Sequence, residues 1–304
     1  MWGILSHLQA HVVKLPRGLN MEELFRFVGE VVDEQTDVRS SHVVFDFSDL
    51  TFIEPVGVVV LCNLIEYLRK TGVKVTFRNH RVDRDCMRYL DDCLFFHRYL
   101  DKNLFDGSKE RAGTVPLQLI AHDQAFSYLS FRLIPWVGDI VGLSKEALDS
   151  LRACLEEIFH NVKDHSGVPI GCAFAQHYPK DRQIQIAVSD FGVGIPTKVR
   201  SVLPDLSDQL ALKRAAAEGF TTKSNVQNRG AGLPNLMRFV TRLGGNVLIA
   251  SERASLSASQ RPTGYKISAK RSADRYPGTL VRVILSTQAL KAVAADTDEE
   301  DFKW

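Results

Sequence analysis

The sequence predicts a two-domain α/β protein, and three observations support that prediction. The chain has 304 residues, which is about twice the length of an ordinary domain. Runs of β-branched residues, typical of strands, alternate with helical apolar stripes both before residue 100 and after residue 114. Between these regions, residues 101–113 are charged, contain two glycines and have little periodicity, so we expect a linker there.

The composition is that of a globular protein and excludes several kinds of partner. Hydrophobic residues make up 45% and charged residues 24% of the chain. Thirty-eight Lys and Arg residues against 36 acids leave a net charge of +2, which gives no electrostatic reason to expect nucleic acid or an anionic membrane. The longest uncharged apolar stretch, Pro55–Ile65, is far shorter than the roughly 20 residues of a membrane span. The chain has five cysteines and no CxxC pair, and its N-terminus does not resemble a secretory signal. We therefore expect a cytoplasmic protein.

The first domain is expected over residues 1–100. Its predicted elements are strands over 11–15, 43–47 and 73–77, a helix that follows Asn20, and helices over 58–70 and 81–99.

The second domain is expected over residues 114–290, followed by an acidic flexible tail at 291–304. Its predicted strands cover 115–121, 170–176, 184–189, 247–251 and 279–285, and its helices 145–164, 206–218 and 234–243. Residues 124–137 are amphipathic, and their pattern does not decide between helix and strand. Polar residues 252–276 separate the last two predicted strands. The basic stretch 253–275 within them is expected to form an exposed hairpin loop rather than a nucleic-acid surface, because no aromatic interleaving supports base stacking.

The helix predicted over 145–164 carries the first chemical motif. Glu157 and Asn161 are four residues apart, so their side chains can converge on one point of the helix surface. A carboxylate beside a carboxamide oxygen suits a hydrated magnesium ion and can orient an attacking hydroxyl or water. A helix with a solvated polar rim is the alternative.

The second motif follows the strand predicted over 184–189. Asp190 comes before Gly192 and Gly194, which let the backbone turn tightly and approach a planar ligand. The Asp190 carboxylate can accept a hydrogen bond from an exocyclic amine such as that of adenine. A turn that only ends the strand is the alternative.

The third and fourth motifs frame the last helix. Gly230, Ala231, Gly232 and Leu233 lead into a helix N-terminus, where free amide groups and the helix dipole favour phosphate. Thr222 and Lys223, a little earlier, add a hydroxyl and a cationic donor. Gly278 and Thr279 open the last predicted strand.

In this order and at these spacings, the four motifs resemble the ATP-binding domain of the gyrase, heat-shock chaperone, histidine kinase and MutL superfamily (GHKL). The resemblance covers roughly residues 115–286 and implies an α/β sandwich of helices on a mixed sheet. Within the superfamily, the motif helix is most similar to that of the anti-sigma-factor serine kinases, although Val162 stands where those proteins usually have alanine.

The resemblance implies ATP and Mg²⁺ as cofactors and gives each matching residue a role. Asn161 would bind the magnesium ion, Asp190 would bind the adenine amino group, and Glu157 matches the general base of the family. The cofactor-binding residues that it implies are Asn161, Asp190, Gly192, Gly194, Ile195, Thr222, Lys223, Gly230, Ala231, Gly232, Leu233 and Thr279.

Residues 42–79 of the first domain resemble a STAS domain, the fold of anti-sigma-factor antagonists. The matching positions are Asp46, Ser48, Phe52, Ile53, Gly57, Gly72 and Val73. Val56 stands where those antagonists carry the serine that is phosphorylated, and valine has no hydroxyl. The resemblance to ATP-binding domains implies that Lys223, Gly230 and Gly232 lie in a flexible lid over the phosphates. We expect the first domain to dock against this lid and restrain it, to recruit a regulated protein, or to act only as a scaffold.

Together the resemblances predict an ATP-binding regulatory protein that hydrolyses ATP or transfers its γ-phosphate to a protein hydroxyl. The alternatives are a non-catalytic ATP-dependent switch that binds a partner through the first domain, and a structural partner with an inactive nucleotide pocket. We expect protein partners, with a homodimer as one option.

Overall fold

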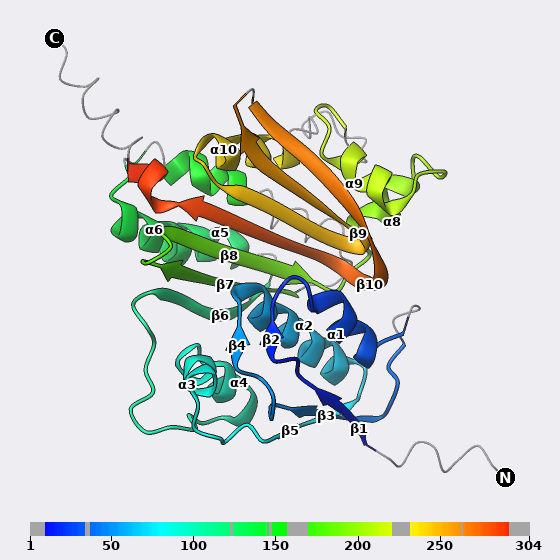
Figure 1. Cartoon of the computed structure of the whole chain (residues 1–304), viewed down its shortest axis with the longest axis vertical. Helices are drawn as coiled ribbons and strands as arrows, with labels where there is room; N and C mark the ends of the chain where they lie inside the picture. The colour runs from blue at the N-terminus through cyan, green and yellow to red at the C-terminus, as the bar shows by residue number, and fades with distance from the viewer. Residues whose placement is uncertain are drawn as a thin grey trace.

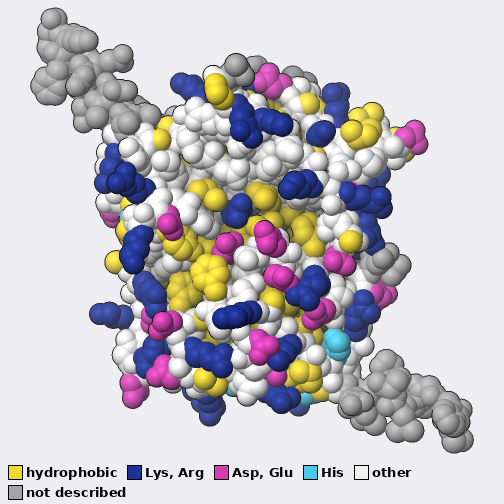
Figure 2. All heavy atoms as spheres, viewed as in Figure 1, with side chains coloured by type: hydrophobic (Ala, Val, Ile, Leu, Met, Phe, Trp, Pro, Cys, Tyr) yellow, Lys and Arg dark blue, Asp and Glu magenta, His cyan; other side chains and the backbone are white. Residues whose placement is uncertain are grey.

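The computed structural model describes residues 10–33, 37–121, 124–143, 145, 148–156, 170–220, 232–262 and 264–291. The described chain is a mixed α/β structure with an N-terminal part up to residue 100 and a C-terminal part from residue 114. Figure 1 shows helices between the sheets of the two parts. Basic and acidic side chains are interspersed over the face seen in Figure 2, as the small net charge predicts.

The N-terminal part is built on a three-stranded parallel sheet in the order β1-β3-β5. Its strands are β1 (His11–Lys14), β3 (His42–Asp46) and β5 (Lys74–Arg78), with a second short pair, β2 (Gly18–Leu19) and β4 (Phe52–Ile53). Helices α1 (Leu24–Val31) and α2 (Pro55–Lys70) connect successive strands. The predicted strands and the first two helices are confirmed.

The helix predicted over 81–99 is interrupted. It consists of α3 (Asp85–Asp92) and α4 (Phe95–Leu100), because Leu94 between them has a left-handed φ of 63° that an α-helix cannot contain. The residues that follow are held against α3. The buried Asp91 carboxylate accepts backbone N–H groups of Leu104 and Phe105, at 2.8 and 3.0 Å from one of its oxygens.

The C-terminal part is built on a five-stranded sheet in the order β6-β7-β8-β10-β9. Its strands are β6 (Thr114–Ala121), β7 (Ile170–Tyr178), β8 (Gln183–Asp190), β9 (Asn246–Arg261) and β10 (Gly264–Ser286). All pairings among these strands are antiparallel, so the expectation of a mixed sheet is wrong for the described residues. Short hairpins join β7 to β8 and β9 to β10, and a hairpin makes its strands antiparallel.

The hairpin of β9 and β10 also corrects the prediction of a loop over 252–276. Both strands continue through this segment, with irregularities near Tyr276. Ala254, Leu256 and Ala258 are buried at alternate positions, which is the period of a half-buried strand. The polar residues between them concealed this alternation.

Helices cover one face of the five-stranded sheet. They are α5 (Ala125–Tyr128), a π-helical turn (Leu129–Leu133), α6 (Ile134–Val141), helical residues over 148–156, α8 (Ile195–Arg200), α9 (Asp208–Ala215) and α10 (Gly232–Arg242). The amphipathic segment is therefore helical, and the helix predicted over 145–164 is confirmed over 148–156. None of the helices in the described ranges combines the length and apolar character that a bilayer crossing demands.

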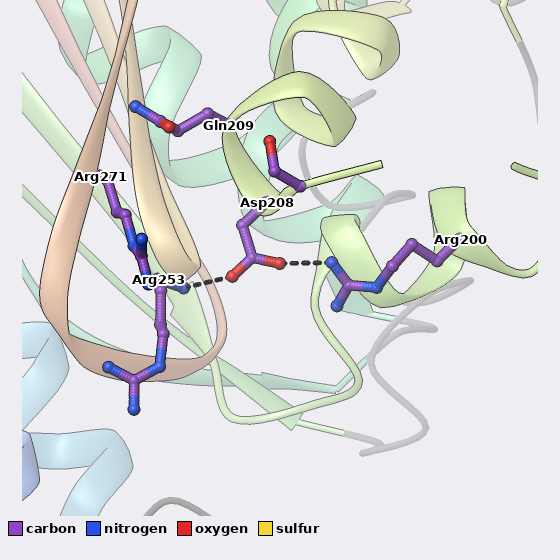
Figure 3. A pocket seen from close by; sticks show the side chains of 6 residues that line it. Arg200, Asp208, Gln209, Arg253 and Arg271 are labelled. Atoms are coloured by element: carbon purple, nitrogen blue, oxygen red, sulfur yellow. Dashed lines mark hydrogen bonds and ion pairs between the residues drawn. The ribbon is translucent and has the colours of Figure 1, made fainter. Parts of the chain in front are cut away.

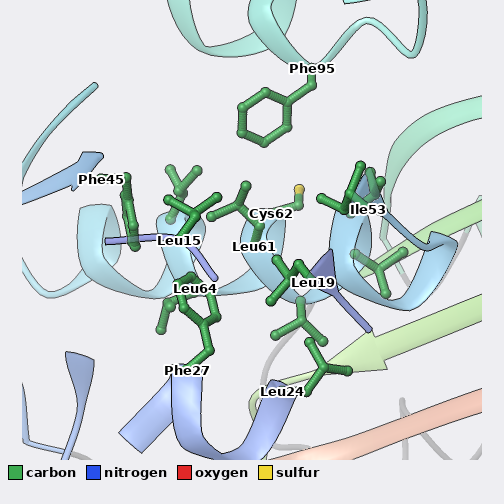
Figure 4. Close-up of a cluster of buried hydrophobic side chains, with 14 of the residues drawn as sticks. Leu15, Leu19, Leu24, Phe27, Phe45, Ile53, Leu61, Cys62, Leu64 and Phe95 are labelled. Carbon is green, nitrogen blue, oxygen red and sulfur yellow. The ribbon is translucent and has the colours of Figure 1, made fainter. Parts of the chain in front are cut away.

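The N-terminal part covers the opposite face of the sheet. Along β7, Cys172 and Phe174 lie in one buried core with α1 and α2, whereas Ala173 and Ala175 lie in the core with the helices. The first core surrounds α2 on several sides, with Phe95 on one side and α1 on another (Figure 4). The two parts thus pack against each other through the sheet, with α1 and α2 on the sheet face away from α10. The expected contact with the nucleotide lid stays a prediction, because Thr222, Lys223, Gly230 and Ala231 lie outside the described residues.

Candidate functional site

Three strand ends bring predicted site residues together at one end of the five-stranded sheet. Asp190, the last residue of β8, lies opposite Thr279 of β10, and Thr279 lies opposite Ser251 of β9. Strand alternation places Asp190 and Thr279 on the same face as Val188 and Val281, which pack in the helix-side core. Asp190 and Thr279 therefore face the helix-covered side of the sheet, where both are buried.

Glycines let the turn after Asp190 lie directly on β10. Gly278 has a φ of +79°, and a Cβ there would lie 2.3 Å from the Asp190 carbonyl oxygen and 2.5 Å from the Gly192 nitrogen. Gly194 has a φ of +80°, and its Cβ would lie 2.9 Å from the Ser251 hydroxyl oxygen. Both positions need glycine for conformation and for space.

Ser251 fastens this turn to both neighbouring strands. Its hydroxyl donates to the Gly278 carbonyl oxygen at 2.5 Å and accepts the Ile195 N–H at 3.1 Å. Ser251 is fully buried. Ile195 begins α8, so the same hydroxyl also fixes the start of that helix. Sequence reasoning missed Ser251, because nothing local distinguishes it from the other serines of β9.

The Asp190 carboxyl group is buried, and no cation among the described residues pairs with it. Only 1% of the residue is exposed, and its Oδ1 accepts the Gly192 N–H at 2.7 Å. Burial raises the pKa of Asp190 to about 7, although backbone N–H groups of Gly192 and Thr279 act in the opposite direction. The ion pairs found among the described residues include none to Asp190. Such a carboxyl gains most from a ligand that donates a hydrogen bond to it.

Two further predicted residues lie at the start of α10. Gly232 is its first residue, and Leu233 packs in the same core as Ile195. The structure thus brings together Asp190, Gly192, Gly194, Ile195 and Thr279. The other predicted residues, Glu157, Asn161, Thr222, Lys223, Gly230 and Ala231, lie outside the described residues.

The opposite side of the turn faces the N-terminal part. The Phe191 ring lies 5.9 Å from the ring of Tyr67 on α2 and 5.5 Å from that of Tyr276 on β10, measured between centroids. The hydroxyls of Tyr276 and Ser189 hydrogen-bond to each other. Sequence reasoning missed this group because its members are far apart in the chain.

A separate open pocket of about 330 Å³ lies where α8, α9 and β9 meet (Figure 3). Arg200, Arg253 and Arg271 line it together with Asp208. The Asp208 carboxylate binds the Arg200 guanidinium and accepts the Arg253 backbone N–H, so it holds these elements together. The Arg253 guanidinium donates to the Ala273 carbonyl rather than into the pocket.

The start of α2 is closed against the five-stranded sheet. Val56 is fully buried, and a Cβ on Gly57 would lie 2.4 Å from the Leu19 carbonyl oxygen. Glu54 Oε2 lies 3.8 Å from Arg282 Nη1 on β10. Burial raises the pKa of Glu54, while the nearby Arg282 guanidinium lowers it. Val56, which stands at the expected position of a phosphorylated serine, is therefore inaccessible and also lacks a hydroxyl.

Comparison with known families identifies the N-terminal part. Residues 18–96 match the STAS domain family, so the chain contains a STAS domain over these residues. The match runs from β2 into α4, and β1, which pairs with β3, precedes it. A search of curated proteins finds no match to this chain.

Proposed function

The chain contains a STAS domain at residues 18–96, and we propose that its C-terminal part binds ATP. We propose further that the chain is an ATP-dependent regulatory protein. It would hydrolyse ATP or transfer the γ-phosphate to a hydroxyl of another protein. One observation carries the proposal: Asp190 is buried beside Thr279 on the helix-covered face, in a turn that needs its glycines, and pairs with no cation among the described residues.

The chemistry of the buried residues fits an adenine base. The Asp190 carboxylate would accept the exocyclic amino group, and Thr279, which lies opposite Asp190, would contribute its hydroxyl. The apolar side chains of Ile195 and Leu233 belong to the core on this face, which suits a planar base. Adenine would supply the donor that the Asp190 carboxyl lacks among the described side chains.

The remaining roles come from the sequence motifs. Asn161 would hold Mg²⁺, which supplies charge neutralisation at the phosphates when bound. Glu157 would accept the proton of the attacking water or hydroxyl. Thr222, Lys223 and the backbone of Gly230, Ala231 and Gly232 would hold the phosphates. Because Val56 is buried and lacks a hydroxyl, the acceptor would be water or another protein.

A non-catalytic switch is the second candidate, and the contact of Phe191 with Tyr67 favours it. This contact joins the proposed nucleotide turn to the STAS domain directly. STAS domains often mediate protein interactions, so a change at the turn could alter what the domain binds. In this case ATP would act as a ligand and turnover would be negligible.

Calorimetric titration with ATP and Mg²⁺ tests the binding proposal. We expect Asp190→Asn to weaken binding at least about tenfold, because an amide nitrogen replaces one acceptor oxygen. Asp46→Asn is the matched control. Asp46 also ends a strand, is buried, and accepts the N–H two residues on at 2.9 Å. Wild-type protein that binds no ATP, or equal losses in both variants, would refute the proposal.

Glu157→Gln separates the enzyme from the switch. If the protein is an enzyme, Glu157→Gln should lose phosphate release and phosphate transfer but keep the wild-type affinity for ATP. Wild-type turnover no higher than that of Glu157→Gln, with ATP binding intact, would leave the switch as the function.

A further inference from the structure

The turn after β8 has two sides that belong to different parts of the molecule. Asp190 lies on the helix-covered face of the sheet, and the next side chain, Phe191, lies on the face covered by the STAS domain. A single peptide unit therefore joins the residue that contacts the STAS domain to the residue of the candidate site.

Phe191 is held by an aromatic cluster that we define as Phe25, Tyr67, Phe191 and Tyr276. Tyr67 and Tyr276 meet the Phe191 ring edge to face, with interplanar angles of 63° and 85°. Phe25 of α1 meets Tyr276 in the same way at 6.0 Å. Two members come from STAS helices and two from the C-terminal part, so the cluster exists only when the two parts are docked.

A charged contact beside the cluster reaches the same turn. Arg275, next to Tyr276 in sequence, pairs with Glu252, with 2.5 Å between Nε and Oε2. A Cβ on Gly194 would lie 3.0 Å from Glu252 Oε1, so Glu252 borders the far end of the turn. The turn is thus bounded at Phe191 by the cluster and at Gly194 by this ion pair.

We infer that Tyr67 of the STAS domain is a positioning residue for the proposed ATP site, acting through Phe191 on Asp190. The inference rests on the proposed ATP binding. It follows that ATP binding and the seating of α2 on the sheet are coupled, and thermodynamic linkage makes the coupling equal in both directions. The STAS domain then senses occupancy of the nucleotide site without touching the nucleotide.

The experiment measures ATP affinity by calorimetry in the full chain. For Tyr67→Leu, which keeps an apolar side chain but removes the ring, we expect the Kd to rise roughly three- to tenfold. Tyr67→Phe keeps the ring and should retain the wild-type Kd. Phe77→Leu removes a ring that packs against Phe47 and Phe95 within the STAS domain, away from the turn. It should lower the melting temperature without changing the Kd.

A double-mutant cycle tests the route of the effect. In a Phe191→Leu background, Tyr67→Leu should change the Kd no further, because the ring contact is already lost. Hydrogen exchange supplies a second readout. ATP should slow exchange of α2 amides in the wild type and in Tyr67→Phe, and have little effect on them in Tyr67→Leu.

The outcomes distinguish the two proposals. If the wild type binds no ATP, the proposed function fails and this inference fails with it. If the wild type binds ATP and Tyr67→Leu binds it equally well, only the inference is overturned. Equal losses in Tyr67→Leu and Phe77→Leu would also overturn it, because they would show general loosening. Equal losses in Tyr67→Leu and Tyr67→Phe would overturn the role of the ring.

Discussion

Two buried aspartates at strand ends have opposite electrostatic surroundings. Burial raises the pKa of Asp46, but hydrogen bonds from Asn79 and Ser48 and the nearby Arg78 outweigh it, so the pKa lies below its ordinary value. Burial raises the pKa of Asp190 to about 7, and its backbone N–H partners do not offset this. Asp46 therefore has partners that stabilise its charge, whereas the described residues supply Asp190 only with backbone N–H groups, which is consistent with the proposed ligand.

This difference predicts how stability depends on pH. The folded protein holds the Asp190 proton more tightly than the unfolded chain does. The contribution of this carboxyl group to the free energy of unfolding is therefore lost as pH rises from about 4 to about 7. Without ATP, the melting temperature of Asp190→Asn minus that of the wild type should be about 2–4 °C larger at pH 8 than at pH 5. Scanning calorimetry at both pH values measures it.

Asp46→Asn provides the comparison. The lowered pKa of Asp46 means that its contribution is present above the ordinary pKa and is lost only in acid. This variant should be less stable than wild type by a similar amount at pH 5 and pH 8. A pH-independent difference for Asp190→Asn would contradict the burial of an uncompensated carboxyl group there.

Gly278 and Gly72 form another informative pair. Both have a φ of +79°, but a Cβ on Gly72 meets nothing within 4 Å, whereas one on Gly278 meets the backbone of Asp190 and Gly192. Gly72→Ala should cost about 1 kcal/mol in the free energy of unfolding, from conformation alone. Gly278→Ala should cost at least about 2 kcal/mol more, because backbone atoms cannot move aside easily.

Urea denaturation of the two glycine variants measures this difference. Equal costs would mean that the turn does not lie against β10 as closely as the structure shows.

At the scale of elements, α2 is covered on nearly all sides. Twelve of its residues are buried, from Pro55 at its start to Leu68 in its last turn. A helix that is apolar all round belongs in an interior rather than on a surface. The antagonists that the sequence resembles carry the acceptor serine at the start of this helix. Here Val56 at that position is fully buried, and the preceding Glu54 lies beside Arg282 of the five-stranded sheet.

Restoring the missing hydroxyl should therefore not restore an acceptor. Val56→Ser places a polar group in a fully buried position and should cost about 1–3 kcal/mol in the free energy of unfolding. Mass spectrometry after incubation with ATP and Mg²⁺ should find no phosphate on the introduced hydroxyl. Val12→Ser, at a position that is 48% exposed, should have little effect on stability. Phosphate on the introduced hydroxyl would show that α2 separates from the sheet.

At the scale of the whole molecule, the two parts share one core. Leu117, Cys172, Phe174, Ala187, Ala250, Tyr276 and Leu280 of the C-terminal part belong to the same buried cluster as the STAS core. The thiols of Cys62 on α2 and Cys172 on β7 are 3.0 Å apart within it. Neither part can separate without exposing this apolar surface to water.

Unfolding should consequently be a single transition. We expect far-ultraviolet circular dichroism and scanning calorimetry to give one coincident midpoint, with equal calorimetric and van't Hoff enthalpies. ATP with Mg²⁺ should raise that midpoint as a whole. Two separate transitions, with only the later one shifted by ATP, would contradict a shared core.

Much of this architecture could be read from local patterns. The strands of both parts, the helix that follows Asn20 and the turn at Asp190 were predictable because periodicity, glycines and chain-breaking residues act over a few positions. The errors have local causes as well. Leu94 carries no signal for its left-handed conformation, and polar residues hid the strand through Ala254 and Leu256.

The sequence alone predicted the candidate site from Asp190, the two glycines after it and the late Gly278-Thr279 pair. It also predicted a STAS domain with valine in place of the acceptor serine. What no pattern could supply is which surfaces meet. The contacts of Ser251 with the turn, of Tyr67 with Phe191 and of Glu54 with Arg282 all join residues that are distant along the chain. Such contacts arise when apolar faces are buried together, and that choice depends on the complementary shape of whole surfaces rather than on neighbours in sequence.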